Sequence, residues 1–165
     1  VVRDINKYSN NTMAQQLFLT LSLRKKGVGT WAGSREVVQQ WLTDTVKAPT
    51  EGLMVDNGAG LSRESRTTAV ALSRVLQHAW RASTMPDFMA SLPASGIDGT
   101  LRRSQAGAGR AHLKTGSLRD VAGVAGYVLG ASGRRYVLVA LVNQEGAGPE
   151  ARRFFDALVV WTADD

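Results

Sequence analysis

The sequence predicts an α+β fold, with a mainly helical region over residues 1–105, antiparallel strands over 111–143 and a C-terminal helix over 149–163. Two observations carry this prediction. Apolar residues recur at helical spacing before residue 93, whereas the later part contains runs rich in Val and Leu that are separated by glycine-rich turns. Elements that are segregated along the chain in this way favour α+β over an alternating α/β fold.

Four helices are expected in the first part of the chain. Their apolar faces span residues 13–21, 37–46, 65–80 and 85–92. Asn11 or Thr12 is a suitable N-cap for the first helix and Ser34 for the second, because a side-chain oxygen can accept a bond from a free backbone N–H. Pro86 is expected to open the fourth helix, since its fixed φ suits a first turn.

The second part of the chain predicts strands. Before it, Leu53–Val55 is expected as a short strand that the turn Asn57–Gly60 follows, and Ser95–Arg110 is expected as a loop. The strands proper span residues 111–115, 121–129 and 136–142. Gly130–Gly133 links the last two as a hairpin, so their pairing should be antiparallel.

Aromatic residues are expected mainly in packing roles. The C-terminal helix has an apolar face made of Ala151, Phe154, Phe155, Leu158, Val159 and Thr162. The four tryptophans, expected in the core or between helices, are Trp31, Trp41, Trp80 and Trp161.

Length and composition limit the classes of protein to consider. The 165 residues suggest one domain, or one domain's worth of a longer protein, and suffice to bury a core. The absence of cysteine excludes disulfide scaffolds, zinc–cysteine sites and thiol nucleophiles. No apolar run reaches the roughly 18 residues of a membrane-spanning helix, and Val1–Asp4 does not resemble the start of a signal peptide.

The charge is basic, with a formal net charge of +6, and 15 of the 20 cations are arginines. Such a balance favours anionic partners. The charge is most concentrated from Gly99 to Arg119, where five cations occur without an acid. These cations are Arg102, Arg103, Arg110, Lys114 and Arg119. We expect this segment to attract a carboxylate or a phosphate.

Most common catalytic and cofactor signatures are missing from the sequence. His78 and His112 have no second ligand at metal spacing, so both are interpreted as structural and no metal or other cofactor is expected. There is no phosphate-binding glycine loop, and no nucleophile-elbow pattern indicates a Ser-His-Asp triad.

Two short motifs do indicate chemistry. Lys114-Thr115-Gly116 ends a predicted strand, and Ser9-Asn10-Asn11 opens a predicted helix. They match K-T-G and S-x-N, two of the signature elements of penicillin-recognising serine enzymes. Each tripeptide alone is weak, but the order of the two, with K-T-G on a late strand before a hairpin and a terminal helix, is more specific.

Further blocks sharpen the match. Gly58–Arg63 resembles a G-S-G-L-S-R block, Leu92–Arg102 resembles L-P-x-x-G-x-D-G-T-L, and His112–Leu118 followed by Ala125–Val128 resembles K-T-G-S/T-L…G-Y-V. Together these blocks resemble the D-alanyl-D-alanine carboxypeptidase/endopeptidase group of low-molecular-mass penicillin-binding proteins, class C. The resemblance runs from about Ser9 to Asn143, and it implies a β-lactamase-like fold of which residues 1–165 form a single, partial penicillin-binding domain.

The resemblance also implies an activity, which is serine-type acyl transfer on peptidoglycan stem peptides that end in D-Ala-D-Ala, with β-lactams as inhibitors. It gives Ser9 the role of a proton relay and Asn11 that of orienting a catalytic lysine and the substrate amide. Lys114 supplies positive potential and Thr115 a hydrogen bond to the terminal carboxylate. Gly116 leaves room for the substrate, and the backbone N–H of Ser117 is one oxyanion donor.

The nucleophile is the main departure from the family pattern. The S-x-x-K helix of the family lies upstream of S-x-N, and only eight residues precede Ser9, so we expect the nucleophilic serine and its lysine outside this chain. Ser22 and Lys25 do read S-x-x-K, but they follow S-x-N on the same helix, roughly 20 Å beyond Ser9 at 1.5 Å per residue. We interpret them as a solvated helix end. Asn57 and Ala59 depart from the family's Asp and Ser.

A second class of function stays open, which is a basic, non-catalytic domain that binds peptidoglycan or nucleic acid. No aromatic residues are interleaved with the basic loop, which argues against single-stranded nucleic acid. The resemblance implies a periplasmic, extracytoplasmic location and a larger sheet than the three strands expected here. The strand over 136–142 should therefore expose an apolar edge that favours self-association or pairing with a missing N-terminal segment.

Overall fold

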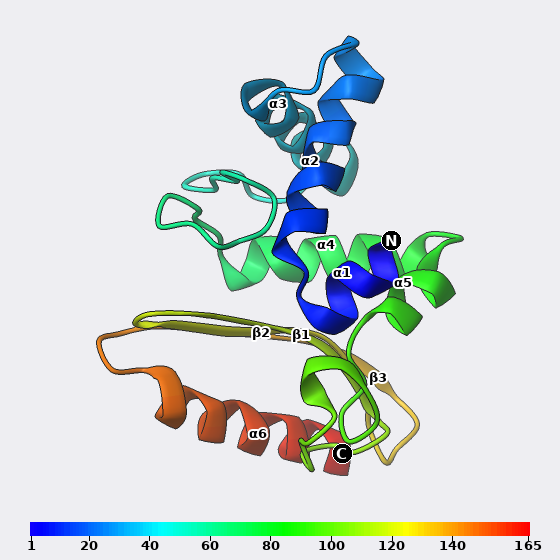
Figure 1. Ribbon diagram of the computed structural model, residues 1–165. Coiled ribbons are helices and arrows are strands. Elements are labelled where there is room, and N and C mark those ends of the chain that lie inside the picture. The colour runs from blue at the N-terminus through cyan, green and yellow to red at the C-terminus, as the bar shows by residue number, and fades with distance from the viewer.

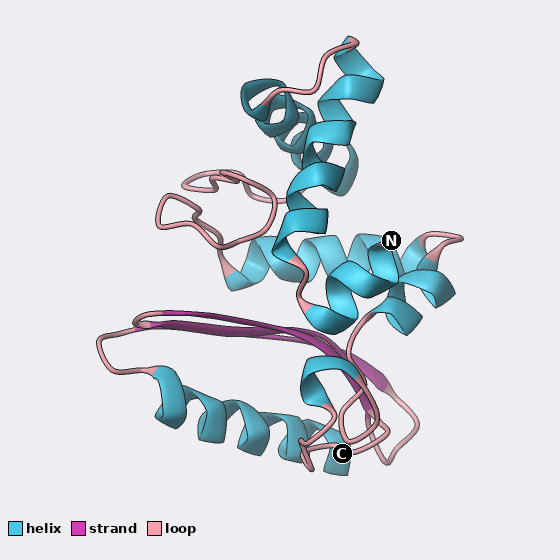
Figure 2. Ribbon diagram, viewed as in Figure 1, coloured by secondary structure: helices cyan, strands magenta, loops and turns pink.

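The computed structural model describes residues 1–165, apart from the side chain of Pro149. A three-stranded antiparallel sheet lies between one long helix, α6 (Gly148–Asp164), and a helical layer on its other face (Figures 1 and 2). The helices of that layer are α1 (Val2–Tyr8), α4 (Ala69–Arg81) and α5 (Met85–Ser91). The helices α2 (Asn11–Lys26) and α3 (Trp31–Trp41) extend away from the sheet, and the α+β prediction is confirmed.

The sheet has the order β1-β2-β3, with both pairs antiparallel. Its strands are β1 (Ala111–Leu118), β2 (Val121–Leu129) and β3 (Arg135–Asn143). The predicted bounds of β2 are confirmed, whereas β1 and β3 run a few residues further than expected. Because β2 is central, β1 and β3 are both edge strands, and the K-T-G motif therefore lies on an edge.

Side chains alternate between the two faces of the sheet, as the pleat of a strand requires. One face packs on α6, where Leu113, Val124 and Leu138 meet Phe155 and Val159 in the largest apolar core. This contact stabilises the packing of α6 on the sheet, since burying each such side chain contributes about 1.5–3 kcal/mol.

The other face of the sheet packs on the helical layer. Tyr127 of β2 is buried there with Leu76 and Leu92, and its hydroxyl donates a 2.7 Å hydrogen bond to the carbonyl of Leu76 in α4. Burial raises the pKa of Tyr127 to about 12, so the phenol stays protonated and remains a donor at neutral pH.

Several predicted helix starts are wrong by a few residues. Asn10 caps α2 by accepting a bond from the Met13 N–H at 3.0 Å, so neither Asn11 nor Thr12 is the cap. Thr30, and not Ser34, caps α3, which begins six residues earlier than its apolar face suggested. Thr68 caps α4, because Ser65 and its neighbours still form the turn and the isolated bridge between Met54 and Arg66.

The expected packing of the large aromatic residues is confirmed in part, since Trp31 contacts Phe18 of α2 and Trp41 contacts His78 of α4, but no tryptophan is buried. All four tryptophans are between 37% and 75% exposed, and Trp161 on α6 is the most exposed of them. Phe154 is 56% exposed, because α6 turns Ala151, Phe155 and Val159 toward the sheet instead. Trp80 still contacts Tyr127, with ring centroids 5.4 Å apart, so one tryptophan does pack across the helix–sheet boundary.

The short helix α1 is absent from the sequence prediction, and one ion pair positions it. Lys7 is only 4% exposed, and its ammonium donates to the Leu92 carbonyl at 2.6 Å and contacts the Asp98 carboxylate at 2.6 Å. Gly99 lies beside this pair at φ 58°, and a Cβ there would sit 2.6 Å from the Lys7 carbonyl oxygen. The end of α1 is thus fixed against the loop that follows α5.

Replacing Asp98 by Asn should destabilise the fold more than replacing Lys7 by Met. The first change leaves a buried ammonium with neutral partners only, whereas the second leaves a carboxylate that is 37% exposed and still accepts the Ala94 N–H. Removing one partner of a buried pair costs about 3–5 kcal/mol. The check is the free energy of unfolding of the protein from urea titration at pH 7, and equal losses for the two variants would contradict the expectation.

The same pair predicts a loss of stability in acid. Burial acts to raise the pKa of Asp98, but the hydrogen bonds from Lys7 and from the Ala94 N–H outweigh it and hold the pKa below 3.8. A depressed pKa stabilises the fold above the unfolded value, and that contribution is lost as the pH falls through the folded value. Urea titrations between pH 5 and pH 2 should therefore show a steeper decline in the free energy of unfolding for wild type than for the Asp98→Asn variant.

Candidate functional site

Lys114 is the residue on which the candidate site centres. Leu113 faces α6, so the neighbouring Lys114 points to the opposite, helical face of the sheet. Its ammonium donates one hydrogen bond to the hydroxyl of Ser9 and another, of 2.9 Å, to the carbonyl of Thr115. The structure thus brings together residues from the two sequence motifs, which lie 105 positions apart.

Ser9 occupies the tight turn between α1 and α2. Its backbone is in the left-handed region, at φ 52° and ψ 47°, where it ends α1. At this turn the chain changes direction from α1, which lies over the sheet, to α2, which extends away from it, and Asn10 caps α2 (Figure 1). The half-buried side chain of Ser9 therefore reaches Lys114 because the Lys7–Asp98 ion pair fixes α1 and because α2 begins only two residues later.

Burial also changes the titration of Lys114. Desolvation of the half-buried ammonium lowers its pKa below the ordinary value of 10.5. No carboxylate is paired with this ammonium in the described part of the chain, so its positive potential is available to an anion that enters the groove. This arrangement suits the recognition of a carboxylate.

The other K-T-G residues line the free edge of β1. Thr115 faces the side of the sheet opposite to Lys114, and its hydroxyl lies 3.5 Å from that of Thr100. Gly116 and Ser117 are exposed, and a Cβ at Gly116 would meet open space. The outer side of β1 pairs with the segment Pro93–Ser95 over residues 111–113, through an isolated bridge between Ala94 and His112. Beyond it no further strand of the sheet pairs with this side of β1, so an extended peptide has room to lie along the edge from residue 114 to 118.

Asn11 is not brought into the same cluster. It is the first residue of α2, it is exposed, and no hydrogen bond joins its side chain to Ser9 or Lys114 within the described residues. If Asn11 orients a catalytic lysine, as the resemblance implies, that lysine must lie beside the start of α2.

Sequence reasoning placed Asp98 in a scaffolding turn near the site, but it missed Lys7 and Thr100 as residues that support the cluster. Lys7 and Asp98 position the turn that carries Ser9, and Thr100 contacts Thr115. The D-G-T part of the Leu92–Arg102 block was the available signal, but a buried partner for Lys7 that lies 91 positions away has no local signature.

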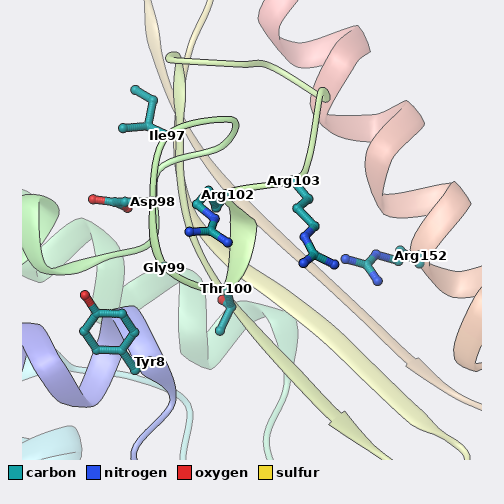
Figure 3. Close-up of a pocket in the computed structure, with 8 residues that line it drawn as sticks. All are labelled: Tyr8, Ile97, Asp98, Gly99, Thr100, Arg102, Arg103 and Arg152. Atoms are coloured by element: carbon teal, nitrogen blue, oxygen red, sulfur yellow. The ribbon is translucent and has the colours of Figure 1, made fainter.

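A basic pocket opens beside this edge (Figure 3). It has a volume of about 670 Å³, and Tyr8 and Thr100 line it together with arginines from the following loop and from α6. Ser9, Lys114 and Thr115 do not line it, but Tyr8 directly precedes Ser9 and the Thr100 hydroxyl lies 3.5 Å from that of Thr115, so the pocket borders the K-T-G cluster at two points.

The interpretation of Ser22 as a solvated residue is wrong, although its rejection as a nucleophile agrees with its surroundings. Ser22 is fully buried and accepts bonds from the Thr30 N–H and the Ser34 hydroxyl, both at 2.9 Å. Its single hydroxyl proton is within reach of the Leu19 and Thr30 carbonyls, each at 3.1 Å. It joins α2 to α3. Lys25, by contrast, is exposed.

Other kinds of site find little support in the described part of the chain. No group of three or more His, Asp or Glu side chains there is arranged to hold a metal ion. His112 is half-buried against the helical layer, and burial lowers its pKa, so the imidazole is neutral at pH 7. None of the described helices is long and apolar enough to cross a membrane.

The known proteins to which this chain is similar include carboxypeptidases. The model of the D-Ala-D-Ala carboxypeptidase 3 (S13) family matches residues 1–165. A D-alanyl-D-alanine carboxypeptidase of an Actinomadura strain is 32% identical over 96% of this chain and 30% of its own length. Carboxypeptidase DacB of Mycolicibacterium smegmatis is 30% identical over 95% of this chain and 35% of its own length. The chain thus spans about a third of the curated relatives it matches.

Solved structures share the fold. Penicillin binding protein 4 of Haemophilus influenzae, solved with a β-lactam, superposes with a TM-score of 0.81 at 21% identity over 96% of this chain and 40% of its own. A predatory endopeptidase from Bdellovibrio bacteriovorus, in complex with an immunity protein, gives a TM-score of 0.80 at 17% identity over 99% and 42%. At these identities the likeness concerns the fold.

Replacing Ser22 by Ala should destabilise the protein, because the Ser22 hydroxyl joins α2 to α3. The change leaves the Thr30 N–H and the Ser34 hydroxyl without their buried acceptor, which costs about 1–3 kcal/mol. The matched control is Thr20→Ala on the exposed face of the same helix, expected within about 0.5 kcal/mol of wild type. Equal urea midpoints for Ser22→Ala and wild type would refute the structural role.

Proposed function

The chain belongs to the D-Ala-D-Ala carboxypeptidase 3 (S13) family, and on that basis we propose that it is the C-terminal part of a serine-type D-Ala-D-Ala carboxypeptidase. The substrate is a peptidoglycan stem peptide outside the cytoplasm, and β-lactams compete for the same groove. The observation that carries the proposal is the hydrogen bond from the Lys114 ammonium to the Ser9 hydroxyl, because it joins S-x-N to K-T-G.

Lys114 and Thr115 bind the terminal carboxylate of the substrate in this proposal. The half-buried ammonium provides positive potential, and the Thr115 hydroxyl, beside Thr100 on the free edge of β1, donates a hydrogen bond. Gly116 lets the peptide approach the strand, and the Ser117 N–H is one of the two oxyanion donors.

Ser9 and Asn11 act on the nitrogen side of the scissile bond. The carbonyl carbon is attacked by a serine oxygen, the C–N bond breaks, and a proton passes to the leaving amine through Ser9. Water then hydrolyses the acyl-enzyme and regenerates the serine. Asn11, at the start of α2, faces the lysine that takes the serine proton.

The nucleophilic serine and its lysine lie outside residues 1–165 in this proposal. Ser22 heads the S-x-x-K match that follows S-x-N, and its hydroxyl is fully engaged in holding α2 against α3. A serine that is 0% exposed has no access to a peptide carbonyl.

Incubation of the full-length protein with a fluorescent penicillin tests the proposal. We expect one stable covalent adduct, located by peptide mapping on a serine outside residues 1–165, and release of D-alanine from diacetyl-L-lysyl-D-alanyl-D-alanine. The Ser22→Ala variant should be labelled like wild type. An adduct on Ser22, or the absence of any adduct on a folded protein, would contradict the proposal.

The pH dependence of acylation should report Lys114. The ammonium binds the carboxylate, and because burial lowers its pKa, acylation should fall as the pH rises at a value below 10.5. Lys114→Arg keeps the charge to higher pH, so this alkaline limb should move upward even if the overall rate is lower. An alkaline limb at the same pH in both proteins would show that another group titrates.

Gly116→Val should block substrate without damaging the fold. A Cβ at this position meets open space, so stability should be unchanged, while the side chain fills the edge where the peptide lies. Misplacing a reacting carbonyl by about 1 Å can lower the rate about 100-fold. The measurement is the acylation rate beside the melting temperature, with Gly148→Ala, where a Cβ also meets open space, as control. Normal acylation of Gly116→Val would refute the edge-binding geometry.

A further inference from the structure

We propose that His112 is a positioning residue for the candidate site, which holds Ser9 at Lys114 only while its imidazole is uncharged. A proton on this ring would place a further cation beside Lys7 and so loosen the ion pair that holds α1 against the sheet. The effect on acylation rests on the proposed function, whereas the coupling between His112 and Lys7 does not depend on it.

His112 lies where β1 meets the segment that fixes α1. It precedes Lys114 by two residues on the strand, so both side chains project to the helical face of the sheet. Its backbone forms an isolated bridge to Ala94. That residue belongs to the segment 92–98, which provides both acceptors of the Lys7 ammonium. A charge on the His112 ring would therefore arise next to the contact on which the position of α1 depends.

One nitrogen of the His112 ring has no partner. Nδ1 is buried, and no hydrogen bond joins it to another group within the described residues. In a neutral imidazole one ring nitrogen carries the hydrogen and the other is an acceptor, and the unpartnered Nδ1 suits the acceptor. Protonation would add an N–H and a positive charge at this atom, and a buried donor without an acceptor is costly. The surroundings of the ring thus favour its neutral form.

The charges that act on this ring are mainly positive. Burial lowers the pKa of His112, and the cations of Lys7 in α1 and of Arg135 at the start of β3 lower it further. The Asp98 carboxylate and the Met89 backbone of α5 act in the opposite direction, but the pKa still lies below 6.5. The carboxylate is already paired with the Lys7 ammonium, so it is not free to pair with an imidazolium.

The other titratable neighbour on this face stays uncharged. Tyr127 of β2 pairs with His112 across the sheet, and its hydroxyl donates to the Leu76 carbonyl of α4. Burial raises the pKa of Tyr127 to about 12, so the phenol keeps its proton in neutral and acidic solution. A change of charge on this face in mild acid therefore falls on His112.

Protonation of His112 would act directly on the pair between Lys7 and Asp98. The imidazolium would repel the buried ammonium and compete with it for the carboxylate, and both effects weaken the contact that fixes α1. Ser9 ends α1 two residues after Lys7, so it would no longer be held at Lys114. This would happen at a higher pH than protonation of Asp98, whose pKa lies below 3.8.

Proton binding favours the loosened form of α1. With α1 in place, the pKa of His112 is lowered, whereas a solvated ring regains the ordinary value of 6.5. The form with the higher pKa binds protons better, so acid shifts the population toward it. The shift begins as the pH falls below 6.5 and is complete below the lowered pKa. At pH 7 and above, His112 leaves the Ser9–Lys114 contact undisturbed.

The acid limb of penicillin acylation tests the proposal in the full-length protein. The rate of labelling by a fluorescent penicillin is measured from pH 4 to pH 8 and is expressed for each protein relative to its own rate at pH 7.5. His112→Gln keeps a polar, uncharged side chain at every pH. Its relative rate at pH 4 should exceed that of wild type about threefold or more, because each pH unit below a pKa removes about nine-tenths of the neutral form.

The matched control is His78→Gln, which removes the other histidine of residues 1–165. The His78 ring packs edge-on against Trp41, with ring centroids 5.7 Å apart, so this variant should keep the wild-type acid limb. An identical acid limb in wild type and in a His112→Gln variant with a normal melting temperature would overturn the proposal. A shift of the limb in both histidine variants would overturn it as well.

NMR titration of the His112 ring in isotope-labelled full-length protein needs no activity and no His112 variant that folds. Lys7→Met removes one cation and frees the Asp98 carboxylate, so the pKa of His112 should rise toward 6.5. Arg135→Gln should raise this pKa less, because Lys7 has the larger effect of the two. An unchanged pKa of His112 in Lys7→Met would overturn the proposal.

The two measurements distinguish this proposal from the proposed function. If the pKa of His112 rises in Lys7→Met but penicillin labels no serine of the folded protein, the carboxypeptidase assignment fails and the coupling of His112 to Lys7 stands. If penicillin labels wild type but neither the pKa nor the acid limb responds to the substitutions, the role of His112 fails and the assignment stands.

Discussion

The candidate site depends on the buried ion pair between Lys7 and Asp98. It connects the first helix of the chain to the loop after α5, and both partners carry functional neighbours. Ser9 follows two residues after Lys7, while Thr100 follows two residues after Asp98. A buried ammonium is costly without a partner, so the pair specifies one relative position of the two segments. That position places Ser9 beside Lys114 and Thr100 beside Thr115.

Because β1 is pleated, the polar side chains of the candidate site lie on the two opposite faces of the sheet at one edge. Lys114 points to the helical face and Thr115 to the α6 face, because successive side chains of a strand alternate. In the proposed function, a peptide along this edge would therefore meet Ser9 and a positive charge on one side and the Thr115 hydroxyl on the other. Backbone pairing with β2 keeps this arrangement rigid, and the free edge keeps it accessible.

The sequence predicted the family and the strands well, since β2 has its expected bounds and K-T-G lies on an edge strand. The sequence did not predict the burial of Lys7 and Ser22, because each is buried by partners that lie elsewhere in the chain. Lys7 looks like an exposed lysine, and α1 has only seven residues, so neither has a local signal. Ser22 looked solvated because the groups that bury it, at Thr30 and Ser34, come from the following segment. The roles assigned to the site residues remain predictions. These residues are Ser9, Asn11, Lys114, Thr115, Gly116 and Ser117.

A crystal structure of the full-length protein acylated by a β-lactam tests the central claim most directly, namely that S-x-N and K-T-G form one carboxylate-binding groove. The account predicts that the carboxylate of the bound drug lies within hydrogen-bond distance of the Thr115 hydroxyl, with the Lys114 ammonium and Ser9 on the same side of the acyl bond. A drug bound with its carboxylate away from β1, or a structure in which Lys114 and Ser9 are separated, would contradict it.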